Sequence, residues 1–197
     1  MSLPEQLLRR AQSAHDPVLM IYAQMGWGLT SYWMGEFLPA REHLEMATTL
    51  YDPERHRSLA FRYGFDAGVT RLSYAAWTLW QLGYPDQALK RGSEALALAQ
   101  RLSHPFTLSS AGLWVGVLRQ YRREARAVQE TAERLIAFSA EHGFPHWLAQ
   151  AEIEHGWAMA EQGHNEEVIA QIQEGLAAFR ATGTEAATCS LPAGRGV

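Results

Sequence analysis

The chain has 197 residues, of which 47% are hydrophobic and 19% charged, and its formal net charge is −4. This apolar content suffices for a folded core, and the charge balance excludes the broad positive surface that nucleic-acid binding needs. No stretch approaches the ~18 apolar residues of a membrane span, and the N-terminal sequence MSLPEQLLRRAQ does not have the pattern of a signal peptide. The single cysteine, Cys189, has no partner for an internal disulfide. We therefore expect a cytoplasmic protein that binds neither nucleic acid nor membrane.

Helix boundary signals recur along the chain. Proline follows a capping position at Asp16-Pro17, His104-Pro105 and Phe144-Pro145, where the first turn of a helix tolerates it. Glycine follows apolar runs with three- and four-residue spacing, as at a helix C-cap. No segment alternates with a period of two, so no strand is predicted. These glycines are Gly83, Gly143, Gly163 and Gly183.

The predicted elements are all helices. A short helix is expected around Pro4–Ala14, followed by four antiparallel helix pairs, with a loop over residues 51–65 between the first two. The predicted fold is an all-α, right-handed α-solenoid that forms one domain over residues 1–183, and residues 184–197 are expected to be an irregular or disordered tail. The pairs are predicted over residues 16–51, 66–102, 104–142 and 145–182.

Self-similarity supports a repeat array. Superposing the pairs on their inner turns, at Gly35, Gly83, Gln120 and Gly163, gives intervals of 48, 37 and 43 residues. Small residues then recur at shared positions, where helices approach closely. A tetratricopeptide unit has about 34 residues, so the extra length is expected in the connections, above all in residues 51–65. The recurring small residues are Gly28, Ala76, Gly156, Ala40, Ala88, Ala125, Ala47, Ala95, Ala132 and Gly175.

These small-residue positions resemble divergent tetratricopeptide repeats (TPR). The segments 51–89, 95–112 and 141–183 also resemble the TPR-like C-terminal helical region of bacterial multidomain signalling proteins, in which a cyclase- or kinase-type module and an AAA-type ATPase precede the tail. The resemblance implies a regulatory, non-catalytic role. The chain has no phosphate-binding loop of the Gly-x4-Gly-Lys-Ser/Thr type, so no catalytic or nucleotide-binding residue is carried over.

One helix face in each pair is rich in aromatic residues. On the superposition above, Trp77, Trp114 and Trp157 take one equivalent position. In the second and third pairs, hydroxyl residues stand one and two turns before this tryptophan. Two interpretations remain open: the aromatic side chains line a groove for a peptide or partner helix, or they fill gaps between helix pairs. The candidate binding groove comprises Tyr22, Tyr32, Thr70, Ser73, Trp77, Trp80, Thr107, Ser110, Trp114 and Trp157.

Catalytic and metal sites are not predicted. Gly143 and Pro145 prevent His142 and His146 from sharing a helix face, and no HExxH motif is present. Glu152 and Glu154 precede His155, but residues two apart point to different sides of a helix, so the two carboxylates do not converge. No catalytic residue, metal or other cofactor is therefore expected.

The last helix carries five apolar residues with no capping repeat after it, which predicts an exposed patch and hence either self-association or a missing continuation of the chain. These residues are Val168, Ile169, Ile172, Leu176 and Phe179. The predicted function is a scaffold for a protein or peptide partner, or for neighbouring domains of a longer chain. The alternative is a sensor that holds a small molecule against the tryptophans.

Overall fold

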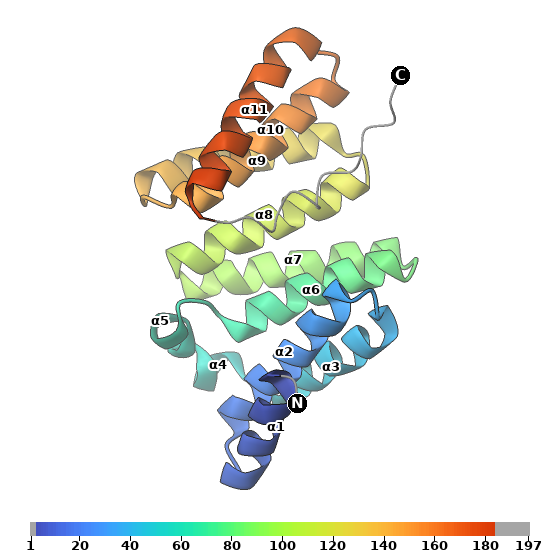
Figure 1. Cartoon of the computed structure of the whole chain (residues 1–197), viewed down its shortest axis with the longest axis vertical. Helices are drawn as coiled ribbons and strands as arrows, with labels where there is room; N and C mark the ends of the chain where they lie inside the picture. Colours follow the sequence, from blue (N-terminus) through green and yellow to red (C-terminus); the bar gives the residue numbers. More distant parts are fainter. Residues whose placement is uncertain (1–2, 184–197) are drawn as a thin grey trace. The chain divides into compact units, whose positions relative to one another are not determined.

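The computed structural model describes residues 3–183, and this range contains eleven helices and no strand (Figure 1). The predicted tail, residues 184–197, lies outside the described residues. The chain divides into two compact units, Met1–Leu118 and Arg119–Val197, and the division falls within α8 (Pro105–Tyr121). None of the helices in the described range is long and apolar enough to cross a membrane.

The first unit is built from antiparallel neighbours. Helix α1 packs against α2, α2 against α3, α6 against α7, and α3 also contacts α6. The predicted N-terminal helix is confirmed as α1. The helices are α1 (Leu3–Ala14), α2 (Pro17–Trp33), α3 (Phe37–Leu50), α4 (Pro53–His56), α5 (Leu59–Tyr63), α6 (Ala67–Gln81), α7 (Pro85–Leu102) and all but the last turn of α8.

The prediction of a loop over residues 51–65 is wrong, because this stretch forms the two short helices α4 and α5 (Figure 1). Asp52 starts α4 by accepting hydrogen bonds from the backbone N–H groups of Glu54 and Arg55. Gly64 ends α5 in the left-handed conformation, with φ of 80°. The segment is therefore ordered by local capping as well as by its aromatic residues.

Small residues set the helix separation in both units. A Cβ on Gly28 of α2 would lie 2.6 Å from Leu44 Cγ of α3. In the second unit a Cβ on Gly156 would lie 2.6 Å from Ile172 Cγ1. Both distances are shorter than real Cβ contacts, so the helices can be this close only because glycine stands there.

The second unit contains α9 (Ala125–Glu141), α10 (Pro145–Glu161) and α11 (Asn165–Ala181), and α10 packs against both others. The predicted exposed patch on the last helix is wrong. Val168 and Phe179 are buried, and Phe179 packs with Ala149 and Ile153 of α10. Of the five apolar residues only Ile169 is largely exposed, because the others face α10.

The turns reveal a regular period that the sequence superposition missed. From α6 onward, residues with positive φ fall every 20 residues, so each helix pair spans 40. In all six of these turns the backbone N–H of the positive-φ residue donates to the carbonyl three residues back. The N–H of the following residue, where its bond is described, donates to the carbonyl five residues back. The positive-φ residues are Gly83, Ser103, Arg123, Gly143, Gly163 and Gly183.

This period corrects two predictions. The extra length beyond a tetratricopeptide unit lies in the helices, since α8 to α11 each have 17 residues and the connections between them have three. The third inner turn is centred on Arg123 rather than Gln120. Three residues are nearly one helical turn, so the misaligned sequence kept its apolar face and concealed the shift. Trp114 is therefore equivalent to Tyr74, whereas Trp77 and Trp157 remain equivalent to each other.

Candidate interaction surface

The ten residues of the predicted groove are mostly enclosed. Six are buried, and Tyr22, Trp80, Trp114 and Trp157 are half-buried. Trp157 belongs to the second unit, and the other nine belong to the first. The buried six are Tyr32, Thr70, Ser73, Trp77, Thr107 and Ser110.

The hydroxyl groups among them bond within their own helices. Thr70 donates to the carbonyl of Asp66, Ser73 to that of Val69, and Ser110 to that of Thr107. Tyr22 packs against Tyr63 and Phe65, with ring centroids 4.9 and 6.0 Å away. Burial, aided by the charge of Asp66, raises the pKa of Tyr22. These side chains hold helices together and have little surface to offer a ligand.

An aromatic cluster crosses the first unit from α2 through α6 to α8. Trp77 is at its centre, with ring centroids 6.0 Å from Tyr32, 5.3 Å from Tyr74 and 6.4 Å from Trp114. The Trp77 indole donates a hydrogen bond of 2.9 Å to the backbone carbonyl of Trp114. Tilted and edge-on contacts of this kind stabilise a core beyond the area they bury. We define the aromatic cluster as Tyr32, Trp33, Phe37, Tyr74, Trp77 and Trp114.

The cluster reaches the surface at the turn between α2 and α3. Trp33 contacts Tyr32 and Tyr74 within the cluster, at 5.4 and 6.4 Å, yet 60% of it is exposed. Met34 and Leu38 follow at 66% and 64% exposure. We call Trp33, Met34 and Leu38 the turn patch. Burial raises the pKa of the Tyr74 hydroxyl, and a hydrogen bond with Trp33 partly offsets the rise.

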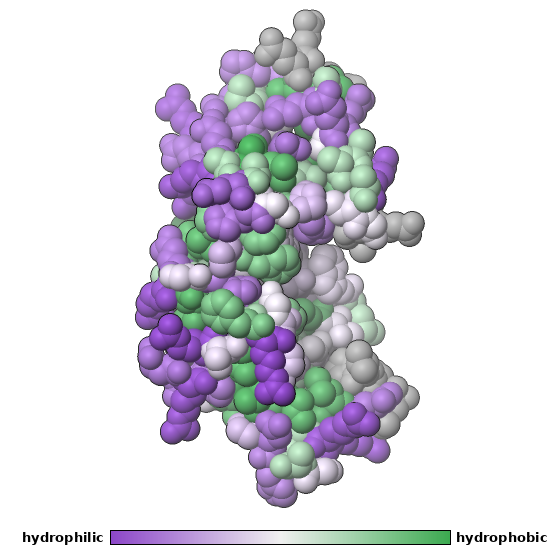
Figure 2. All heavy atoms as spheres, turned by 90° about the vertical axis from the view of Figure 1, so that its left-hand side faces the viewer, coloured by the Kyte–Doolittle hydropathy of each residue, from purple (hydrophilic) through white to green (hydrophobic). Residues whose placement is uncertain are grey.

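The turn patch was missed in the sequence. Its three residues lie at the end of one helix, across a turn and at the start of the next, so they follow no helical spacing. The signal available was Gly35, whose positive φ marks the tight turn that separates Met34 from Leu38. A second area with exposed apolar residues lies on α5, where Phe61 is 70% exposed and Tyr63 41%. On the face that carries α4 and α5, Figure 2 shows hydrophobic side chains interleaved with hydrophilic ones.

The histidines considered for a metal site have separate surroundings. His142 stacks on Phe138 with ring centroids 4.1 Å apart, and His146 packs on Phe179 at 4.9 Å. His155 lies beside Gln171 of α11. Burial lowers the pKa of His146. Within the described residues, no three His, Cys, Asp or Glu side chains gather as metal ligands.

The fold and surface define a helical-repeat protein. No family model matches the sequence, and no curated protein matches it. Among solved structures, BtubC (BKLC) from P. vanneervenii is similar, with a TM-score of 0.69 and 22% identity over 99% of this chain and 76% of that one. A Rap protein solved in complex with Competence and Sporulation Factor gives a TM-score of 0.52 and 15% identity over 88% of this chain and 57% of that one.

At these identities the likeness establishes the fold, and the predicted fold class, an all-α array of TPR-like repeats, is confirmed.

Proposed function

We propose that the protein is a non-catalytic helical-repeat scaffold that binds a protein or peptide partner at the turn patch. The observation that carries this proposal is the exposure of Trp33, Met34 and Leu38 at one tip, above a rigid aromatic cluster. Exposed aromatic and Met residues are enriched at protein interfaces. Because contacts within the aromatic cluster already fix the Trp33 ring, partner binding costs little further side-chain entropy.

In this proposal the residues of the predicted groove have a structural role and are not the binding surface. Trp77 and Tyr32 support the turn patch from beneath instead of touching the partner, which is the gap-filling role that the sequence left open. The Rap protein, solved with Competence and Sporulation Factor, is an example of this fold with a bound partner. The proposal includes a cytoplasmic location and a regulatory tail of a bacterial signalling protein. Sequencing the coding region around this chain, and looking for a continuous ATPase module, tests that wider context.

The alternative, a small molecule held against the tryptophans, lacks a matching cavity among those described. A hollow of about 340 Å³ lies over α3, α6 and α7, which is within the usual range for ligand pockets. It is lined by Arg41, Glu45, Lys90 and other residues, but by none of the tryptophans.

Comparative pull-downs from the source organism test the scaffold proposal. The bait variants are wild type, Trp33→Ala with Leu38→Ser, and Phe61→Ser as a control that removes an equally exposed apolar residue elsewhere. A partner that is retained by Phe61→Ser and lost with the patch variant is then purified and titrated. Loss of a Trp anchor at an interface costs about 2 kcal/mol or more, so Kd should rise about 30-fold. Equal affinity of the patch variant and wild type for every purified partner contradicts the proposal.

A further inference from the structure

A basic groove lies between α3 and α7, on residues that the aromatic cluster does not use. Two adjoining hollows of about 740 and 340 Å³ share Thr48, Leu72 and Arg91 as lining residues. Together they are lined by five basic side chains and two acidic ones, within a chain of net charge −4. The basic residues are Arg41, Arg71, Lys90, Arg91 and Arg101, and the acidic ones are Glu45 and Glu94.

Local ion pairs neutralise only part of this charge. Arg41 pairs with Glu45 at 2.8 Å, and Arg91 pairs with Glu94 at 2.7 Å. The other three basic residues have no carboxylate within ion-pair distance in the described range. The two hollows are therefore lined by three more basic side chains than acidic ones.

Of these three basic residues, Arg71 is the least expected in the groove, because its charged side chain is buried. It is only 6% exposed, and its Nη1 donates a hydrogen bond of 2.6 Å to the Thr48 hydroxyl. Its Nε is enclosed and meets no acceptor. Its guanidinium lies 5.2 Å from the centroid of the Tyr51 ring. A buried cation with an unsatisfied donor costs several kcal/mol unless an anion compensates it.

The surroundings keep Arg71 charged without pairing it. Burial lowers its pKa to about 10, so the guanidinium remains protonated at neutral pH. The carboxylate of Asp66 is engaged elsewhere, since it accepts from the Tyr51 hydroxyl at 2.8 Å and from the Val69 N–H at 2.8 Å. The nearby charge of Arg91 repels that of Arg71. An anion in the larger hollow, which Arg71 and Arg91 both line, offsets this repulsion.

The lining of the larger hollow combines charged, polar and apolar side chains. On α7, Arg91, Leu98 and Arg101 share one face by their spacing of seven and three residues. The floor is apolar, with Leu72 and Leu98, and Thr48 contributes a hydroxyl. Guanidinium groups bind carboxylate and phosphate oxygens through pairs of hydrogen bonds. Several such groups around one hollow suit a ligand with more than one negative charge.

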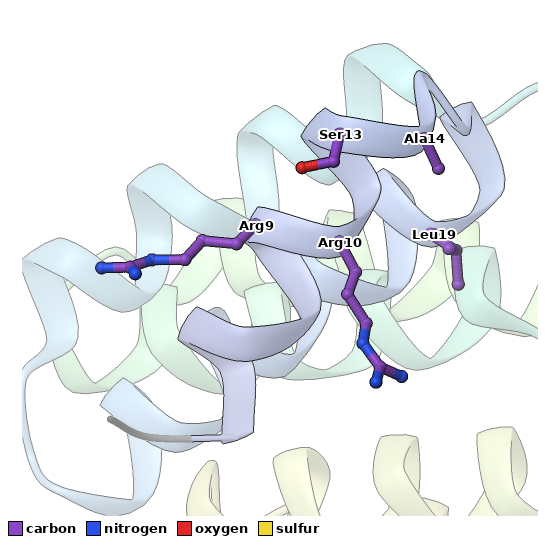
Figure 3. Close-up of a pocket in the computed structure, with 5 residues that line it drawn as sticks. All are labelled: Arg9, Arg10, Ser13, Ala14 and Leu19. Carbon is purple, nitrogen blue, oxygen red and sulfur yellow. The ribbon is translucent and has the colours of Figure 1, made fainter.

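A second basic hollow on the same unit lacks these features. It has about 520 Å³ over α1 and α2 and is lined by Arg9, Arg10, Ser13, Ala14 and Leu19. Figure 3 shows the Arg9 and Arg10 side chains pointing in different directions. Both arginines are exposed, so water already solvates them. A substitution in this hollow therefore serves as a matched control for substitutions in the groove between α3 and α7.

We propose that the hollow formed by Arg71, Arg91 and Arg101 binds a multiply charged oxyanion, with Arg71 as the buried anchor and Arg101 at the rim. The shared chemistry is that of clustered carboxylates or of phosphoryl groups. This site is independent of the turn patch, so either proposal can fail without the other.

Isothermal titration of the full chain with sodium citrate and with sodium pyrophosphate, at matched ionic strength, tests the site. Saturable binding of either probe supports it, and the probe that binds identifies carboxylate or phosphoryl chemistry. Arg101→Gln and Arg71→Met should each weaken binding about tenfold or more, and Arg10→Gln should leave it unchanged.

Thermal unfolding separates binding from folding. Arg71→Met should melt at the same temperature as the wild type or higher, because it removes an unpaired buried charge. Arg101→Gln removes a rim charge on α7 and provides a second test should Arg71→Met fail to fold. The proposal is overturned if neither probe binds saturably, or if Arg10→Gln and Arg101→Gln weaken binding equally.

Discussion

Replacing Trp77 by alanine tests whether this tryptophan stabilises the core or lines a binding groove. The side chain is 8% exposed, contacts three other rings and donates a hydrogen bond to the Trp114 carbonyl. Removing a buried Trp costs about 3–5 kcal/mol, against a total stability of roughly 5–15 kcal/mol for a domain. Trp77→Ala should therefore lose about a fifth or more of the free energy of unfolding. Trp33→Ala, at 60% exposure, should lose only about 1 kcal/mol from its ring contacts.

Urea unfolding followed by far-ultraviolet circular dichroism measures both losses. Trp77→Phe is the intermediate case, because it keeps a ring and removes only the indole N–H that donates to the Trp114 carbonyl, at a cost of about 0.5–1.5 kcal/mol for the lost hydrogen bond. If Trp77→Ala unfolds at the same urea concentration as wild type and instead loses partner binding, the assignment of Trp77 to the core is refuted.

Three further predictions concern a buried carboxyl and two backbone sites. Burial raises the pKa of Glu154 well above its usual value, so the native state holds a proton that the unfolded state releases, and stability falls as pH rises from about 4.3 through the native pKa. In thermal melts at a series of pH values, the melting temperature of Glu154→Gln should fall less with rising pH than that of the wild type, because glutamine has no proton to release. Arg123 has φ of 61° in the third inner turn, and replacing it by glycine removes about 1–2 kcal/mol of left-handed strain together with an exposed ion pair to Glu161 worth up to about 1 kcal/mol. Arg123→Gly should therefore stabilise the protein by about 0.5–1 kcal/mol in urea unfolding. Gly156→Ala should destabilise by about 1–3 kcal/mol because its Cβ meets Ile172, whereas Gly26→Ala, which meets nothing within 4 Å, should stabilise by up to about 1 kcal/mol.

Much of the fold could be predicted because its signals are local. Prolines after capping positions and glycines after apolar runs marked helix ends that the structure also has, such as Pro105 and Gly163. The register of the third pair could not be predicted this way. Its turn residue is Arg123, which gives no sign of positive φ in the sequence, and a three-residue error preserves the apolar face.

The candidate site depended on contacts that helical spacing does not encode. The turn patch joins residues across a tight turn. The aromatic cluster includes contacts between residues far apart in the sequence, such as Trp77 and Trp114, which are 37 residues apart. Spacing placed Thr70 and Ser73 on one face but could not say that their hydroxyls bond back to their own helix. The unpaired charge of Arg71 became visible only with the positions of Asp66 and Tyr51.

Photo-crosslinking tests the central claim, that the turn patch contacts a partner, most directly. A photo-reactive phenylalanine analogue is placed at Leu38 in the turn patch, or at Met46, a control position on the same helix that is 42% exposed. After irradiation in a lysate of the source organism, mass spectrometry identifies the attached proteins. The claim predicts one dominant adduct at Leu38 that is absent at Met46 and is displaced by excess wild-type protein. The same adducts at both positions, or none that wild-type protein displaces, would contradict it.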